Sequence, residues 1–227
     1  MNNLLINNLE KAEFINKPFK YSLFQLLNLE TNNKLINNFY RIIDNLKNKK
    51  TNNKSLSSSR FMIELFGDTE NGINYKNYEF LKKIEPLNSI LLEYQDNIIK
   101  TLIKKYNLQE KKNYKYCIML VYDKKNYLVG PHTDSFFRAV TQVTYIVHDN
   151  DSDKKLGVKI YKDKINIHKK EWLKKHYDLD DTFEELKQID YYPGSTINFK
   201  VSKNSFHGVT KINQDCERMS IQMYIFK

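Results

Sequence analysis

The sequence predicts an α+β protein in which helices pack against an antiparallel β-sandwich or barrel. The first half of the chain carries apolar residues at helical spacing, whereas from Tyr114 onward short alternating segments are separated by turns. With 227 residues, 41% of them hydrophobic, the chain is long enough to bury a substantial core. We therefore expect one domain over 1–227, with a supporting part (1–113) and a β-rich core (114–227).

The supporting part is expected to contain one strand and two long helices. The apolar residues of Met1–Lys17 fit either a short helix or a loose arm, and Asn48–Ser59 has the polar composition of a surface loop. The other expected elements are a strand within Pro18–Leu27, a helix that begins at Glu30-Thr31, and a helix over Asn77–Tyr106 that is broken near Pro86.

The core is expected to contain six short strands and a helical insertion. The expected strands are 116–122, 139–147, 157–161, 195–199, 205–209 and 219–226, with a turn at 123–131 after the first. Between them, 163–190 returns to helical spacing, over 169–176 and again over 182–186. We interpret this segment as an insertion near the mouth of the barrel, suited to a lid over a substrate.

Composition narrows the class of protein. There is no run of about 18 apolar residues, and the first residues lack the charged start and apolar centre of a signal peptide. We therefore expect a soluble, cytoplasmic protein without a membrane span. Cys117 and Cys216 lack metal-site spacing and are too few for a disulfide framework, so reduced thiols are expected.

The net charge of +10 is weak support for a nucleic-acid partner. The excess is 33 Lys against 4 Arg, scattered among 27 Asn, a bias typical of A/T-rich coding. Specific readers of phosphates and bases depend on Arg instead. The same bias favours a role for each arginine that is present: Arg41, Arg60, Arg138 and Arg218.

A candidate metal site lies in the segment Val129–Asp134. His132 and Asp134 are two residues apart directly after a turn, and in extended backbone such side chains share a face. His207 is the candidate third ligand. Two histidines and one carboxylate form the facial triad that holds non-haem Fe(II) and leaves open positions on the metal.

A second His-x-Asp pattern, at His176 and Asp178, is a poorer candidate. It lies in a charged segment with helical spacing, where residues two apart point about 200° from each other. His148 and His168 have no carboxylate at a useful spacing and are expected at the surface or in turns.

The order of motifs downstream of Tyr116 resembles the iron(II)/2-oxoglutarate-dependent oxygenase superfamily, in its prolyl-hydroxylase-like and phytanoyl-hydroxylase-like branches. The pattern over Tyr116–Lys227 is a strand, His-x-Asp, Arg-x-x-Thr-x-x-x-Tyr, Pro-Gly, Phe, His-Gly-Val and Arg-x-Ser. The resemblance implies a double-stranded β-helix (jelly-roll) barrel with helices packed on one sheet. It also implies Fe(II), 2-oxoglutarate and O2 as cofactor and co-substrates.

Carried over to this chain, the resemblance makes His132, Asp134 and His207 the iron ligands. It makes Arg218 the partner of the distal carboxylate of 2-oxoglutarate, and a guanidinium suits that task because it forks onto a carboxylate and keeps its charge when buried.

Other residues are expected to support this site. Ser220 shares the strand face of Arg218, and Tyr122 and Tyr145 match tyrosines that contact the co-substrate in the prolyl-hydroxylase-like branch. Thr141 is a weaker candidate on the face of Tyr145. Arg138 is expected either to hold an acidic substrate group or to form a surface salt bridge.

The expected activity is hydroxylation of a C–H bond with release of succinate and CO2. Halogenating relatives lack the ligand carboxylate that Asp134 supplies, and nucleic-acid demethylases of the superfamily carry a second arginine that is absent after Arg218. Two alternatives stay open: a basic nucleic-acid or protein binding module with a vestigial metal site, and a zinc hydrolase, which would leave Arg218 unexplained. The substrate, a small molecule or a protein side chain, has no readable signature.

Overall fold

The computed structural model describes residues 2–47, 59–69, 72–73, 81–109, 114–148, 154–165, 182–212 and 217–227. Its helices are α1 (Asn2–Lys11), α2 (Leu29–Lys47), α4 (Leu87–Glu93) and α5 (Ile99–Lys105), with a π-helical segment at Tyr94–Ile98 and a 3-10 turn at Lys154–Leu156. Its strands are β1 (Phe14–Ile15), β2 (Tyr21–Gln25), β3 (Arg60–Thr69), β4 (Gly72–Ile73), β5 (Tyr116–Asp123), β6 (Val129–His132), β7 (Arg138–Ile146), β8 (Lys159–Asp163), β9 (Phe183–Gln188), β10 (Ser195–Lys200), β11 (His207–Val209) and β12 (Arg218–Phe226).

The described strands form two antiparallel sheets. The larger has the order β1-β2-β10-β7-β12-β5-β3-β4, and the smaller has the order β6-β11-β8-β9. From β5 onward the chain passes back and forth between them, since β5, β7, β10 and β12 belong to the first sheet and β6, β8, β9 and β11 to the second. The expectation of a mostly antiparallel β-protein with a few helices is confirmed.

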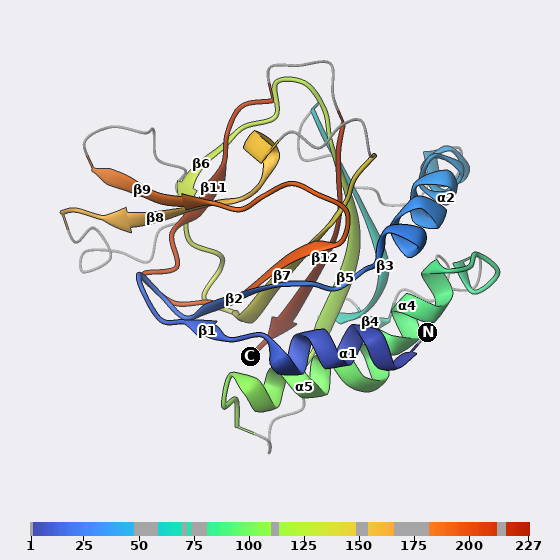
Figure 1. The fold of residues 1–227 in the computed structure, drawn as a ribbon, viewed down its shortest axis with the longest axis horizontal. Coiled ribbons are helices and arrows are strands. Elements are labelled where there is room, and N and C mark those ends of the chain that lie inside the picture. Colours follow the sequence, from blue (N-terminus) through green and yellow to red (C-terminus); the bar gives the residue numbers. More distant parts are fainter. Residues whose placement is uncertain are drawn as a thin grey trace.

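The helices cover one face of the eight-stranded sheet, as expected. In Figure 1 they lie on one side of that sheet and the four-stranded sheet lies on the other. The core between helices and sheet contains Phe39 of α2, Leu102 of α5, and Leu120 and Ile221 of β5 and β12. Side chains alternate along a strand, so the neighbouring residues of β5 and β12 face the second sheet.

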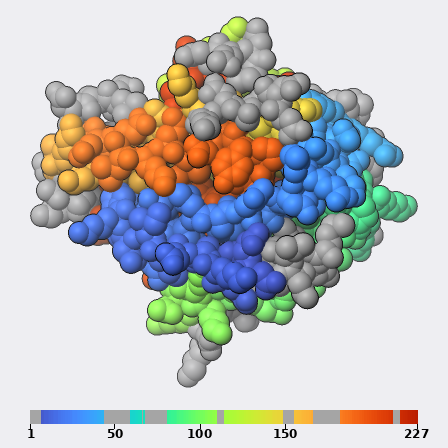
Figure 2. All heavy atoms as spheres, viewed as in Figure 1, coloured from blue at the N-terminus to red at the C-terminus, as the bar shows by residue number. Residues whose placement is uncertain are grey.

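A second apolar core lies between the two sheets. Val143 and Phe199 from the larger sheet pack there with Ile160 from β8. Strand β2, near the N-terminus, extends the larger sheet beside β10. In Figure 2 the blue N-terminal segment lies along the orange segment. At the turn before β10, Gly194 adopts a φ of 73°, and a Cβ there would lie 2.0 Å from the carbonyl oxygen of Leu27, so a side chain would not fit.

Most predicted elements are found within a few residues of their expected bounds. The strand in Pro18–Leu27 is β2, the helix expected from Glu30 is α2, and the helix expected after Pro86 runs from Leu87 to Lys105 through the π-helical segment. Residues 48–58 and 166–181, which include His168, His176 and Asp178, lie outside the described residues. No described helix combines the length and apolar character that a membrane span requires.

Two predictions about secondary structure were wrong, and one strand was not predicted. The segment 182–186 was expected to be helical, but Phe183–Gln188 forms strand β9. Its residues are good helix formers, yet pairing with β8 and the 2.7 Å ion pair between Lys159 and Glu185 fix it as a strand. The expected turn at 123–131 contains the start of β6, and the long strand β3 was not foreseen.

Candidate metal site

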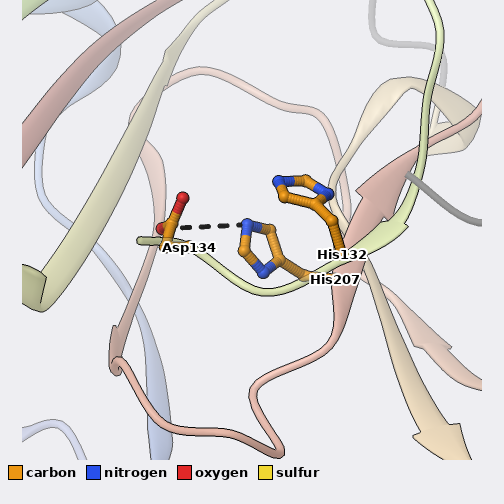
Figure 3. A group of neighbouring side chains, drawn as sticks. All are labelled: His132, Asp134 and His207. Atoms are coloured by element: carbon orange, nitrogen blue, oxygen red, sulfur yellow. Dashed lines mark ion pairs between the residues drawn. The ribbon is translucent and has the colours of Figure 1, made fainter. Parts of the chain in front are cut away.

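Two strands of the smaller sheet bring the three candidate ligands together. His132 ends β6 and His207 begins β11, and the two residues are direct partners in the antiparallel pairing of these strands. Asp134 follows two residues after His132. One ligand atom of each side chain lies within 4.8 Å of the others, and Figure 3 shows the three side chains gathered there. The sequence prediction of which residues meet is therefore matched by the geometry.

The backbone of this region sets which nitrogen of each imidazole faces the cluster. Nδ1 of His132 lies 3.0 Å from the carbonyl oxygen of Gly130, and Nδ1 of His207 lies 2.9 Å from that of Ser205. A carbonyl oxygen only accepts, so each Nδ1 carries the hydrogen and donates it. Each Nε2 then keeps its lone pair for a metal, the arrangement usual for histidine ligands.

A glycine lets β6 and β11 approach closely enough for this pairing. A Cβ on Gly208 would lie 2.7 Å from the carbonyl oxygen of Val129 and 2.9 Å from that of Gly130. Both contacts involve backbone atoms that have little freedom to move. The Gly in the sequence His207-Gly208 is thus required by the distance between the strands.

Two side chains from β7 hold the carboxylate of Asp134. Nη1 of Arg138 donates to Oδ1 at 2.6 Å, and the hydroxyl of Thr141 donates to Oδ2 at 2.5 Å. Oδ2 is also 3.9 Å from Nε2 of His207. Burial alone would raise the pKa of Asp134, but Arg138, the two histidines and the Thr141 hydrogen bond outweigh it and lower the pKa to about 2.

This set of donors suits a divalent transition metal. Two imidazole nitrogens and one ionised carboxylate oxygen are a common ligand set for such ions. The carboxylate is kept charged, and its orientation is fixed by partners outside the ligand set, as in known metal sites. Three such ligands would leave positions on a bound metal for other molecules.

Arg218 lies at the start of β12, and its side chain points into the space between the sheets. The residue is buried, with only 2% of its surface exposed. Its expected partner was an external carboxylate, but the structure gives it an internal one. Nε and Nη2 donate to Oδ2 of Asp123 at 3.1 and 2.6 Å, and Nη1 donates to the carbonyl oxygen of Leu156 at 3.2 Å.

Two of the expected supporting residues lie next to Arg218 and one does not. Ser220 and Tyr145 are direct partners across β12 and β7, and both are buried. The hydroxyl of Tyr145 accepts a hydrogen bond from the backbone N–H of Val158 at 2.7 Å. Tyr122 instead packs in the core under the helices, with its ring centroid 5.8 Å from that of Phe39, so the structure does not bring it to this site.

The interactions of Arg138 and Thr141 with Asp134 were not predicted from the sequence. Arg138 was expected to hold a substrate or form a surface salt bridge, but its partner is Asp134, and its guanidinium lies 3.7 Å from the ring centroid of Tyr224. The only signal was the spacing of four and seven residues after Asp134. His148 lies elsewhere, stacked on Tyr40 at a ring distance of 6.3 Å.

Comparison with known proteins finds similar structures but no similar sequences. No protein-family model matches the chain, and no curated protein sequence matches it significantly. A prolyl-4-hydroxylase from Pseudomonas putida aligns with a TM-score of 0.54 over 100% of this chain and 99% of that one, at 9% identity.

Two further solved structures extend this comparison. A prolyl hydroxylase from Trichoplax adhaerens, solved with a peptide fragment of hypoxia inducible factor, aligns with a TM-score of 0.53 over 99% of this chain and 88% of that one, at 11% identity. The non-heme alpha ketoglutarate dependent carbocyclase SnoK from nogalamycin biosynthesis aligns with a TM-score of 0.56 over 91% and 79%, at 9% identity.

These alignments cover nearly the whole chain, and they show that its fold is the one found in prolyl hydroxylases and other 2-oxoglutarate-dependent oxygenases. At such low identity they show the fold alone. Any function has to be argued from the residues of this chain.

We predict that His132→Ala and His207→Ala each weaken the binding of a divalent metal by more than about 100-fold, because replacing only an outer partner of a ligand already costs 10- to 100-fold. Equilibrium dialysis with Co(II) measures this loss. His148→Ala is the control and should bind Co(II) as the parent does. Parental affinity in both site variants would show that these residues are not metal ligands.

We also predict that Thr141→Val weakens Co(II) binding by about 10-fold, because Oδ2 of Asp134 loses the hydroxyl that orients it. Thr210→Val is a matched control, since the buried hydroxyl of Thr210 has no hydrogen-bond partner among the described residues. Equal effects of the two substitutions would argue against an orienting role for Thr141.

Proposed function

We propose that the protein is an Fe(II)- and 2-oxoglutarate-dependent dioxygenase that hydroxylates a C–H bond of its substrate. The observation that carries the proposal is the cluster of His132, Asp134 and His207 within 4.8 Å, in a chain that shares its fold with solved oxygenases of this kind. The alternation of β5 to β12 between two sheets supports a double-stranded β-helix as the scaffold. The whole chain, 1–227, is then one oxygenase domain.

The proposed iron ligands are the Nε2 atoms of His132 and His207 and a carboxylate oxygen of Asp134. Arg138 and Thr141 fix the plane of that carboxylate, so one direction stays available for the metal. When bound, iron and 2-oxoglutarate supply an oxidative decarboxylation that activates O2 and yields succinate and CO2. His132, Asp134 and His207 would hold the iron as a facial triad, the ligand set that leaves positions open for 2-oxoglutarate and O2.

Arg218, Ser220 and Tyr145 are the proposed site for the distal carboxylate of 2-oxoglutarate. A guanidinium has five N–H groups, and among the described residues Arg218 directs three of them at Asp123 and Leu156. One N–H on each Nη atom is left to donate. The hydroxyl of Tyr145 accepts from Val158, and with no acceptor for it among the described residues its own hydrogen can be donated to a carboxylate.

Apolar side chains around this site exclude water from the reacting groups. Phe199 packs against His207, with ring centroids 4.6 Å apart, and it belongs to the apolar core between the sheets. Low water content strengthens the interaction of Arg218 with a carboxylate. Tyr122 lies in the other core and is left out of the proposed site.

The substrate is a small molecule or a protein side chain. The Trichoplax enzyme was solved with a peptide fragment and SnoK acts as a carbocyclase, so the shared fold is used with both kinds of substrate. Nucleic acid is not the proposed substrate, because Arg218 is not followed by the second arginine that nucleic-acid demethylases of this superfamily carry. A cytoplasmic location stays a prediction.

Substrate-free turnover tests the proposed function. We expect the Fe(II)-loaded protein to convert 2-oxoglutarate slowly to succinate in the presence of O2, because oxygenases of this kind decarboxylate some of the co-substrate even when no substrate is bound. Succinate is measured with and without iron, and His207→Ala serves as the inactive control. Pools of candidate small molecules and peptides should raise the rate when they contain the substrate. An absence of succinate under every condition would refute the proposal.

Replacing Arg218 tests the proposed co-substrate site. A buried charge-assisted pair that loses one partner costs about 2 to 5 kcal/mol, so Arg218→Ala should weaken 2-oxoglutarate binding by about 30-fold or more. Arg218→Lys should recover part of this, because it keeps the charge but loses the fork. Anaerobic titration of the Fe(II) protein, followed by its metal-to-ligand absorption band, measures the affinity.

Arg41→Ala, on the exposed side of α2, is the control for loss of positive charge. Metal binding should stay near the parental value in all three variants. If Arg218→Ala binds 2-oxoglutarate as tightly as the parent, the distal carboxylate binds elsewhere.

A further inference from the structure

Three charged side chains lie side by side on neighbouring strands next to the proposed co-substrate site. Asp123 at the end of β5 is paired in register with Arg218 on β12 and with Arg60 on β3. Oδ2 of Asp123 accepts the 2.6 Å hydrogen bond from Arg218, and its Oδ1 lies 2.8 Å from Nε of Arg60. Nη2 of Arg60 also donates to Oδ2 at 3.4 Å.

Burial strengthens the electrostatic effect of the charges in this cluster, because little water is present to screen them. The side chains of Asp123 and Arg218 are 0% and 2% exposed, and that of Arg60 is 15% exposed. Two guanidinium groups and one carboxylate leave a net charge of +1. Because water screens such a site poorly, one added or removed charge changes the potential at its centre considerably.

Tyr127 ties the two arginines together without changing this charge. Its ring centroid lies 4.4 Å from the guanidinium carbon of Arg60 and 5.8 Å from that of Arg218. Nη1 of Arg60 donates to its hydroxyl. Burial raises the pKa of Tyr127 to about 12, so the phenol stays neutral at physiological pH.

Asp123 neutralises the charge of Arg218, and Arg60 restores a net positive charge to the cluster. With Asp123 alone, Arg218 would form a neutral buried pair and would attract an incoming anion only weakly. We propose that Arg60 compensates Asp123, so that the cluster keeps one positive charge for an organic carboxylate, and that Asp123 lowers the affinity for that carboxylate. Arg60 and Asp123 are then positioning residues that act through Arg218. The inference rests on the proposed function, because the carboxylate meant is the distal one of 2-oxoglutarate.

A series of charge variants tests this inference. Arg60→Gln makes the cluster neutral and should weaken 2-oxoglutarate binding by about 10-fold, whereas Arg60→Lys should weaken it less. Asp123→Asn raises the net charge to +2 and should tighten binding. The double variant Arg60→Gln/Asp123→Asn returns the charge to +1 and should bind nearly as the parent does.

The probes are 2-oxoglutarate and 2-oxobutyrate, each titrated anaerobically into the Fe(II) protein. 2-Oxobutyrate shares the keto acid end and lacks the distal carboxylate, so its affinity should change little across the series. Circular dichroism and thermal unfolding establish that each variant is folded. If Asp123→Asn alone does not fold, the comparison of Arg60→Gln with Arg60→Lys and the double variant decides the question.

The outcomes separate this inference from the proposed function. A parent protein that binds neither keto acid would overturn the proposed function and the inference with it. Parental binding of 2-oxoglutarate that weakens alike in Arg60→Gln, Asp123→Asn and the double variant would show a purely structural role and overturn the inference alone. Equal changes for both keto acids would also overturn it, because the effect would then not reach the distal carboxylate.

Discussion

The pairing of β6 with β11 is the constraint on which the site depends. These two short strands are far apart in sequence, and their register sets His132 directly opposite His207. Gly208 permits the close approach, and backbone carbonyls fix the tautomer of each ring. A slip of one residue would turn one imidazole to the other face of the sheet and destroy the cluster.

Buried charge in this protein is organised around arginine. The chain has 33 Lys and 4 Arg, and three of the four arginines serve two buried carboxylates. Arg138 holds Asp134, while Arg60 and Arg218 share Asp123. A planar guanidinium keeps its charge and satisfies several acceptors at once, which the flexible ammonium of lysine does less well in a dry interior. The scarcity of arginine in the sequence was thus a useful sign of structural importance.

The sequence indicated which three candidate ligands lie together, but not the whole path of the chain around them. Local spacing was enough to put His132 and Asp134 on one face, whereas the choice of His207 and Arg218 depended on the resemblance of the downstream motifs to the oxygenase superfamily. Tyr122 was expected at this site but lies in the core under the helices, and only the pairing of Arg218 with Asp123 reveals which face of β5 points between the two sheets. Strand β9 could not be foreseen either, because its helix-forming residues become a strand only through β8.

Strand β9 also has a consequence for how the molecule meets other copies of itself. Among the described strands it lies at the end of the four-stranded order, so one row of its backbone N–H and C=O groups has no partner strand there. Glu184, Glu185 and Lys187 are exposed along it. A strand added from another chain would lie beside these charged side chains and remove part of their hydration, which costs free energy. The charged residues that made the segment look helical therefore also disfavour the addition of a strand from another chain at this edge.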